Sequence, residues 1–272
     1  YTIDYAKKIN FKVHNSKKMK KKKKSKYSFQ TEENYTYFEN RKKYLKRKYD
    51  STALDEIADG FPKYAKRQEI TRFLARHELF KKVLEREGSI VECGVYNGNG
   101  LFSWAALSAI YEPIGGINRS VIGFDTFSGF PSVHKKDTKS GKLKWKKGDV
   151  SSNSFEDINE SIKLFNQNRF LNQFNKIEVV KGDFLKTGKK FIKDNPHLVV
   201  SLLFLDFDIY SPTKEALKIF LPRMPKGSII VFDEINHPLW PGETEALLEC
   251  MDINKKEIKR FSFEVNMSYL IV

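Results

Sequence analysis

From about residue 51 onward, helix-like and strand-like hydrophobic patterns alternate along the chain. Residues 68–86 place their apolar side chains at helical spacing on one face, which predicts an amphipathic helix. The same reasoning predicts helices over 100–111, 154–168, 184–195, 212–220 and 242–252. Short, nearly continuous apolar runs predict buried strands over 88–95, 120–125, 176–183, 198–206 and 227–234.

Strands that alternate with helices are typical of a mostly parallel sheet with helices on both faces. Two further apolar runs, 257–265 and 267–272, are separated by little more than Asn266 and predict an antiparallel hairpin at the end of the chain. The expected fold is therefore a Rossmann-like α/β domain with a mostly parallel seven-stranded sheet and a C-terminal antiparallel hairpin.

Charge divides the chain into two parts. Residues 1–50 hold 17 Lys or Arg and five Asp or Glu, whereas the other 222 residues hold 32 and 29. We therefore expect a basic N-terminal extension over 1–50, partly disordered or helical, and one domain over 51–272. Within that domain, the polar and lysine-rich residues 131–153 predict a lid or loop, and Ser154 is the expected N-cap of the helix that follows.

The extension contains a block of eight lysines in ten residues, Lys17 to Lys26. Such a block repels itself and contacts polyanions such as nucleic acid, anionic lipid or glycan through non-specific charge. A solvated tail is the simpler interpretation. Residues 33–50 follow with a helical pattern.

Neither a membrane-spanning apolar run nor a secretory signal is visible in the sequence. Two cysteines, Cys93 and Cys250, do not form a disulfide framework and are expected to pack as reduced thiols. These observations predict a cytoplasmic protein.

The first stretch with chemistry is Glu92-x-Gly94-x-x-x-Gly98-x-Gly100, between an expected strand and an expected helix. Glycines at such a turn let a ligand approach the backbone. The spacing is neither the nicotinamide fingerprint nor a phosphate loop. An acid before the glycines suits a cationic or amine-bearing ligand, such as the amino-acid end of S-adenosylmethionine. An ordinary tight turn is the competing interpretation.

Two later strand ends add features of an adenosine site. Asp125 ends the second strand, where an acid accepts hydrogen bonds from ribose hydroxyls. Asp183 ends the third strand, where it is placed to accept from an adenine amino group while Phe184 packs on the ring.

Strands four and five end in acids as well. Asp206 and Asp208 follow the fourth strand, and Asp233 and Glu234 follow the fifth. If these strands are neighbours, the like charges repel unless a cation neutralises them, and oxygen ligands favour Mg²⁺. The competing interpretation is that the acids face solvent or cap helices.

Five segments together resemble the macrocin O-methyltransferase family in order and spacing over roughly residues 60–255. They are IVECGVYNGNG, GFDTFSGFP, KGDF, LDFDIYSPT and IIVFDEI…PGETEA. The most specific match is the pattern Asp-x-Asp-x-Tyr-x-x-Thr, carried by Asp206, Asp208, Tyr210 and Thr213. The resemblance implies a class I methyltransferase that uses S-adenosylmethionine and Mg²⁺ to methylate a sugar hydroxyl.

The resemblance also implies roles for individual residues. Asp206, Asp233 and Glu234 would bind the metal, and Asp208 would be the general base. The residues that would hold the cofactor are Glu92, Gly94, Val95, Tyr96, Gly98, Asp125, Thr126, Asp183, Phe184 and Asp206. Three residues are candidates for the substrate pocket: Tyr210, His237 and Trp240.

The chain departs from the family pattern at the end of the fifth strand. Asp233-Glu234-Ile235 stands where Asp-Asp-Tyr is usual, and the longer glutamate arm shifts the oxygens by one methylene. We therefore expect a magnesium-assisted O-methyltransferase for a sugar or a glycosylated or nucleotide-linked metabolite, as a possible homo-oligomer. The alternatives are a non-catalytic binding protein on this fold, a nucleic-acid methyltransferase that uses the lysine block, and a related oxygenase.

Overall fold

The structure is a computed structural model, and it describes residues 32–49, 54–138 and 144–272. The chain divides into two compact units, Tyr1–Ile70 and Thr71–Val272. The division between these units lies within helix α5 (Arg67–Val83), and the boundary expected near residue 50 between extension and domain stays a prediction. The lysine block Lys17–Lys26 lies outside the described residues.

The first unit is helical where it is described. It contains α2 (Glu32–Tyr49), α3 (Leu54–Asp59), α4 (Phe61–Tyr64) and the start of α5. The helix expected within residues 33–50 is thus confirmed. Arg41 donates to the Tyr64 carbonyl at 2.6 Å, and the Tyr44 and Tyr64 rings stack with centroids 6.2 Å apart.

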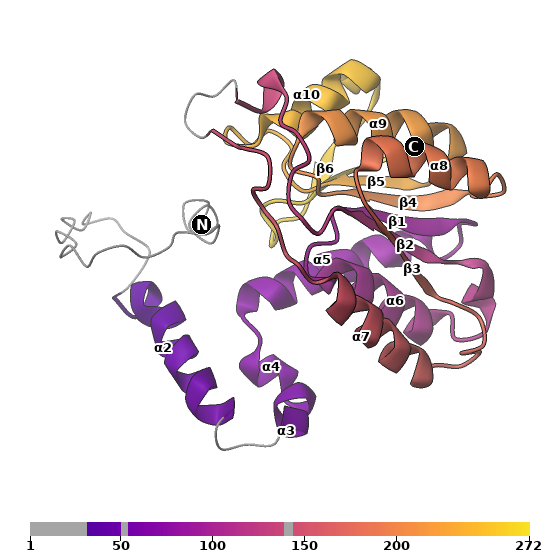
Figure 1. The fold of residues 1–272 in the computed structure, drawn as a ribbon. Helices are drawn as coiled ribbons and strands as arrows, with labels where there is room; N and C mark the ends of the chain where they lie inside the picture. Colours follow the sequence, from indigo (N-terminus) through magenta and orange to yellow (C-terminus); the bar gives the residue numbers. More distant parts are fainter. Residues whose placement is uncertain (1–31, 50–53, 139–143) are drawn as a thin grey trace. The chain divides into compact units, whose positions relative to one another are not determined.

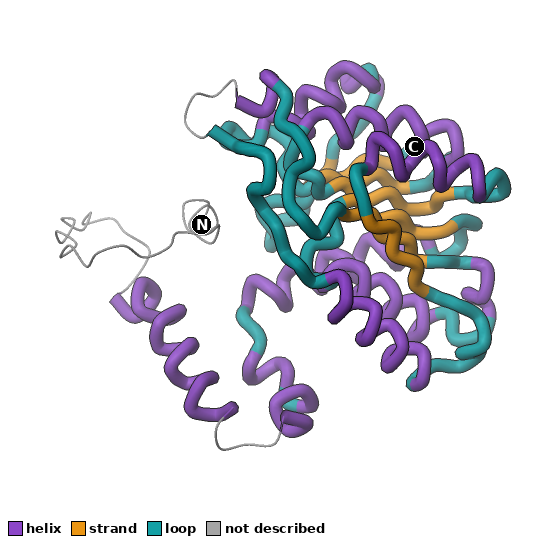
Figure 2. Tube along the Cα trace, viewed as in Figure 1, coloured by secondary structure: helices purple, strands orange, loops and turns teal. Residues whose placement is uncertain are grey.

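The second unit is a seven-stranded sheet between two layers of helices (Figures 1 and 2). The strands are β1 (Ser89–Cys93), β2 (Val121–Asp125), β3 (Ile177–Lys181), β4 (Val200–Leu205), β5 (Ile229–Phe232), β6 (Lys259–Arg260) and β7 (Ser268–Ile271). The helices after α5 are α6 (Asn99–Tyr111), α7 (Phe155–Gln167), α8 (Phe184–Asp194), α9 (Tyr210–Phe220) and α10 (Pro241–Cys250). The strand order is β3-β2-β1-β4-β5-β7-β6, with β1 to β5 parallel and β7 antiparallel to both of its neighbours. The expected fold class is confirmed.

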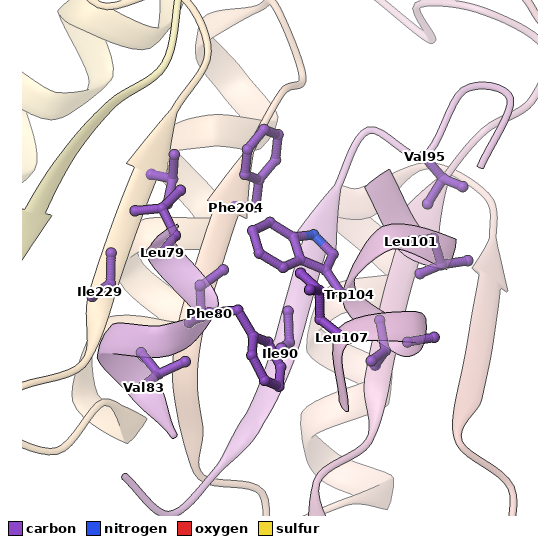
Figure 3. Close-up of a cluster of buried hydrophobic side chains, with 14 of the residues drawn as sticks. Leu79, Phe80, Val83, Ile90, Val95, Leu101, Trp104, Leu107, Phe204 and Ile229 are labelled. Carbon is purple, nitrogen blue, oxygen red and sulfur yellow. The ribbon is translucent and has the colours of Figure 1, made fainter. Parts of the chain in front are cut away.

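The central strands are apolar on both faces because helices cover both sides of the sheet. Alternate residues of β4 enter opposite cores: Leu202 and Phe204 pack with α5, α6 and α7, whereas Leu203 and Leu205 pack with α8, α9 and α10. Figure 3 shows the first core, where the Trp104 ring lies 5.9 Å from that of Phe204. Continuous apolar runs were therefore the correct signal for these strands.

The C-terminal hairpin is confirmed, but its connection is longer than expected. The strand β6 has only two residues, and residues 261–267 join it to β7. The Glu264 carboxylate accepts from the backbone N–H groups of Asn266 and Met267 at 2.9 and 2.6 Å, which folds the connection back on itself. Apolar residues in this segment therefore do not continue the strand.

Of the helices in the described part of the chain, none has the length and apolar character needed to cross a membrane.

The packing of α5 predicts that alanine substitutions of a buried and an exposed leucine on this helix affect stability differently. Leu79 is fully buried in the core beneath the sheet, and Leu74 on the same helix is 47% exposed. We expect Leu79→Ala to lower the free energy of unfolding by about 2–5 kcal/mol, because it leaves a cavity. Leu74→Ala should change it by less than about 1 kcal/mol. Urea unfolding measures both, and equal losses would contradict this placement of α5.

Candidate active site

The candidate site lies at the edge of the sheet where β1, β2, β4 and β5 end. The strand order reverses direction between β1 and β4, and open α/β sheets bind ligands at this switch point. The acids expected to have a function lie at or near the carboxyl ends of these strands or of β3.

Gly94 lets the turns after β1 and β4 touch. Its φ is +96°, and a Cβ built on it would lie 1.9 Å from the Asp206 carbonyl oxygen. The Asp206 N–H donates to the Cys93 carbonyl at 2.8 Å. A side chain at position 94 would therefore push apart the turns that carry the two halves of the site.

The Asp125 carboxylate organises the glycine-rich turn. It accepts from the Tyr96 N–H at 2.7 Å and from the Phe127 N–H at 2.6 Å. Burial raises the pKa of Asp125, and these backbone donors oppose that rise. Val95 is buried beside this turn, whereas Tyr96 is 49% exposed, with a φ of +51°. Asp125 therefore joins the ends of β1 and β2 at the place expected for a ribose.

The remaining expected cofactor residues serve mainly local structure. Gly98 precedes α6 with a φ of +84°. The Thr126 hydroxyl donates to the Gly129 carbonyl at 2.6 Å. Asp183 is the N-cap of α8 and accepts from the Leu185 N–H at 3.1 Å. Phe184 is buried, with its ring 5.1 Å from that of Phe124, so it packs in the core and presents no free face to a ligand.

Ser154 occupies the N-cap position of α7, as expected, but its side chain makes no capping hydrogen bond. Its hydroxyl donates instead to the Tyr96 carbonyl. The start of α7 is therefore tied to the exposed tip of the glycine-rich turn.

Glu92 is a buried carboxylate beneath α6. It accepts from the Trp104 indole N–H at 2.7 Å, and both of its oxygens lie 2.4 Å from where a Gly100 Cβ would be. Burial raises its pKa to about 7, against the opposing effects of Arg76 and Trp104. Gly100 is thus required by the packing of Glu92 against the helix, and the carboxylate faces α6 rather than solvent.

Three carboxylates meet where β4 and β5 end. One oxygen each from Asp206, Asp208 and Glu234 lies within 4.8 Å of the others, which is close enough to share a metal ion. Glu234 Oε2 is buried and has no hydrogen-bond partner among the described residues. Burial, followed by the charge of Asp233, raises the pKa of Asp208 to about 8 and that of Glu234 well above its usual range. Burial and mutual repulsion thus oppose the simultaneous ionisation of these acids, which a bound cation would favour.

Asp233 is held by an arginine that the sequence did not single out. The Arg72 guanidinium donates to both Asp233 oxygens, at 2.8 and 3.2 Å, and lies 3.6 Å from Asp206 Oδ2. We expected Asp233 to complete a set of metal ligands with Asp206 and Glu234. The structure places it in this ion pair and brings Asp208 into the cluster instead.

A second residue without an expected role is Glu243, in the first turn of α10. It is fully buried, and its carboxylate accepts from the backbone N–H groups of Asp208 at 3.3 Å and Glu234 at 3.2 Å. Burial raises the pKa of Glu243 well above its usual range. The segment PGETEA belonged to the family resemblance, but an acid in a helical pattern gave no sign of these contacts.

The lid is anchored to α9 by Asp137. This buried carboxylate accepts from the Tyr210 N–H at 2.7 Å and from the His134 N–H at 2.8 Å. The Tyr210 ring stacks on His134 and lies under the Lys136 ammonium, and its hydroxyl donates to Glu249 at 2.5 Å. Tyr210, expected in the substrate pocket, therefore holds the lid against α9 and α10.

Trp240 also serves the lid. Its ring stacks on that of Trp145, with centroids 3.9 Å apart, and the Trp145 indole donates to the Leu239 carbonyl at 3.3 Å. One face of Trp240 is thus already covered, and the residue is buried. His237, the third expected substrate residue, is half-buried, and burial lowers its pKa.

The crowding at Gly94 predicts a large effect of one added methyl group. We expect Gly94→Ala to lower the free energy of unfolding by more than about 2 kcal/mol, because it combines an unfavourable φ with a backbone clash. Gly115→Ala is the control, since a Cβ there meets no atom within 4 Å and should cost no more than about 0.5 kcal/mol. Similar midpoints of chemical denaturation for the two variants would refute this role of Gly94.

Glu92 predicts a pH dependence of stability. Its pKa is about 7 in the folded protein and about 4.5 in the unfolded chain, so the folded state keeps the proton longer. The stability from this group is complete below about pH 4.5 and is lost as the pH rises through about 7. Relative to Glu92→Gln, the wild type should lose up to about 3 kcal/mol across that interval.

The measurement is the free energy of unfolding at several pH values. Glu156→Gln, at an exposed position in α7, is the control and should follow the wild-type profile. Parallel profiles for Glu92→Gln and the wild type would contradict a raised pKa at Glu92.

Comparisons with known proteins agree with this architecture. A calicheamicin methyltransferase, CalS11, is 28% identical, with a TM-score of 0.81 over 90% of this chain and 94% of its own. The apo structure of CalS11, described as a TDP-rhamnose 3'-O-methyltransferase, is 26% identical, with a TM-score of 0.75 over 90% and 96% of the two chains. The O-methyltransferase NovP, at 18% identity and a TM-score of 0.55 over 74% and 79%, shares the fold.

A comparison with curated proteins gives no match. The model of the macrocin-O-methyltransferase (TylF) family matches residues 3–249. The match begins well before residue 60, so the family likeness reaches further toward the N-terminus than the range of about 60–255 that we expected. With a match over most of its length, the chain belongs to the macrocin-O-methyltransferase family and is an O-methyltransferase.

Proposed function

We propose that the protein transfers a methyl group from S-adenosylmethionine to a hydroxyl of a sugar, carried on a glycosylated or nucleotide-linked metabolite, with the help of Mg²⁺. The observation that carries the proposal is the cluster of Asp206, Asp208 and Glu234 where β4 and β5 end, beside the switch point of the sheet. The similar protein CalS11 is described as a TDP-rhamnose 3'-O-methyltransferase, which supports a nucleotide-linked sugar as the acceptor class.

The residues of the cluster fit a hard divalent ion. All the donors are carboxylate oxygens, which Mg²⁺ prefers. Within the described part of the chain, no group donates a hydrogen bond to the buried Glu234 Oε2. In our proposal Asp206 and Glu234 hold the ion. A bound ion of this kind lowers the pKa of an acceptor hydroxyl and orients it. Asp233 acts through Arg72, whose guanidinium links it to Asp206 and keeps both side chains in place.

Asp208 is the proposed general base. Its backbone is left-handed, with a φ of +64°, which turns the residue away from the direction of the preceding strand. Its carboxylate lies in the same cluster as Asp206 and Glu234. A base there is within reach of a hydroxyl bound at the cluster, and it removes the proton as the oxygen attacks.

The glycine-rich turn and the ends of β2 and β3 form the proposed cofactor site, where S-adenosylmethionine supplies the methyl group when bound. The Asp125 oxygens accept from the Tyr96 and Phe127 N–H groups, and we assign a remaining lone pair of this carboxylate to a ribose hydroxyl. Asp183 uses Oδ1 to cap α8, and we assign Oδ2 to the adenine amino group. Glu92, Gly94, Val95 and Gly98 act by shaping the turn, and Phe184 is left out because it is buried.

For the acceptor pocket we retain His237. Trp240 is held in its stack with Trp145, and the Tyr210 hydroxyl is engaged by Glu249, so His237 is the one of the three expected residues outside these two contacts. The described lysines of the lid give that segment a basic surface suited to the phosphates of a nucleotide sugar. The cytoplasmic location expected from the free thiols of Cys93 and Cys250, and a homo-oligomeric state, stay predictions.

Calorimetry with S-adenosylhomocysteine, repeated with Mg²⁺ and with a chelator, tests the cofactor and metal together. A screen of nucleotide sugars for methyl acceptance then tests the acceptor class. Absence of S-adenosylhomocysteine binding would remove the proposed donor. Binding without turnover on any acceptor would favour the alternative of a non-catalytic binding protein.

Asp206→Ala should abolish Mg²⁺-dependent methyl transfer, because it removes a ligand from the cluster, and it should leave S-adenosylhomocysteine affinity within about threefold of the wild type. Asp157→Ala, at an exposed position in α7, should retain full activity. Rates measured against Mg²⁺ concentration, with binding measured separately, check both effects. Normal turnover by Asp206→Ala would show that this acid does not bind the metal.

A further inference from the structure

Glu243 bridges the turns that carry the proposed base and a proposed metal ligand. Its Oε1 accepts from the Asp208 N–H at 3.3 Å, and its Oε2 accepts from the Glu234 N–H at 3.2 Å. The two turns follow different strands, β4 and β5, and one carboxylate spans the gap between them. Glu243 is completely buried, so bulk solvent does not reach these contacts.

The position of Glu243 is determined by the start of α10. Gly242 precedes it, and a Cβ on Gly242 would lie 2.5 Å from the Tyr210 N–H nitrogen and 2.3 Å from Asp137 Oδ1. The helix therefore begins in direct contact with the turn that leads from Asp208 into α9. This packing fixes the distance between the Glu243 side chain and the turn that carries Asp208.

Both residues that Glu243 holds need outside support. Asp208 has a φ of +64°, a conformation that costs a non-glycine residue free energy and persists where the surroundings fix it. Glu234 has a longer side chain than aspartate and therefore more rotatable bonds to order before its oxygens reach the cluster. A backbone fixed at both residues limits how far the two carboxylates can separate.

We propose that Glu243 is a positioning residue, which sets the separation of Asp208 and Glu234 so that the cluster binds Mg²⁺ and the base faces the acceptor. The inference rests on the proposed function. It assigns Glu243 no contact with the metal, the cofactor or the acceptor.

The test uses two variants that separate the effect of the length of the Glu243 side chain from the effect of its charge. Glu243→Gln keeps the length but puts an amide NH₂ against one of the two N–H groups. Glu243→Asp keeps the negative charge, but its side chain is one methylene too short to reach both the Asp208 N–H and the Glu234 N–H. We expect each variant to weaken Mg²⁺ binding to the full-length protein about 10- to 100-fold, the usual effect of removing a residue that orients a ligand. S-adenosylhomocysteine affinity should stay within about threefold of the wild type.

Glu245→Gln is the matched control, since Glu245 lies on the same helix and pairs with Lys136 of the lid. It should leave Mg²⁺ affinity unchanged. Isothermal titration with Mg²⁺ gives the affinities, and the melting temperature of each variant shows that it is folded.

The outcomes distinguish the two proposals. Wild-type Mg²⁺ affinity in Glu243→Asp, with a loss only in Glu243→Gln, would show that Glu243 contributes charge alone and would overturn the positioning role. Unchanged affinity in both variants would overturn it as well, with the proposed function intact. Absence of Mg²⁺ binding by the wild-type protein would overturn the metal part of the proposed function together with this inference.

Discussion

Repulsion among buried carboxylates is the constraint on which the site depends. Asp206, Asp208, Asp233, Glu234 and Glu243 all lie near the ends of β4 and β5. Buried like charges repel one another and push the strand ends apart unless cations or N–H donors oppose them. In this protein the Arg72 guanidinium forms an ion pair with Asp233, and backbone N–H groups donate hydrogen bonds to Glu243. Among the described groups, the Asp206, Asp208 and Glu234 cluster is the part of this charge that calls for an added cation.

The strand pattern predicted the fold well because parallel strands buried on both faces are apolar at nearly every position. Helices after β1, β3 and β4 began close to where the sequence placed them. The connection between β6 and β7 was missed, since Phe261 and Phe263 look like strand residues. Their rings instead pack against each other, with centroids 5.3 Å apart, while Glu264 turns the backbone. Phe263 and Val265 stay 47% and 77% exposed, so apolar character alone does not distinguish a strand from a turn.

The sequence predicted those parts of the site whose function depends on position along a strand. It predicted less well the parts that depend on contacts between segments far apart in the chain. Ends of parallel strands share one edge, so Asp125, Asp206 and Glu234 were correctly placed near it. The roles of Arg72 and Glu243 depend on which helix face packs against which turn, and no local pattern records this. Tyr210 and Trp240 are amphipathic aromatic residues, equally suited to a sugar or to a lid, and the structure uses them for the lid.

The stacked indoles of Trp145 and Trp240 have a consequence for following the protein in solution. They account for two of its three tryptophans, and one belongs to the lid while the other follows the acidic cluster. Aromatic rings this close couple electronically, so their circular dichroism and fluorescence depend on their separation. The unlabelled protein therefore carries its own optical reporter of whether the lid remains docked while a ligand enters.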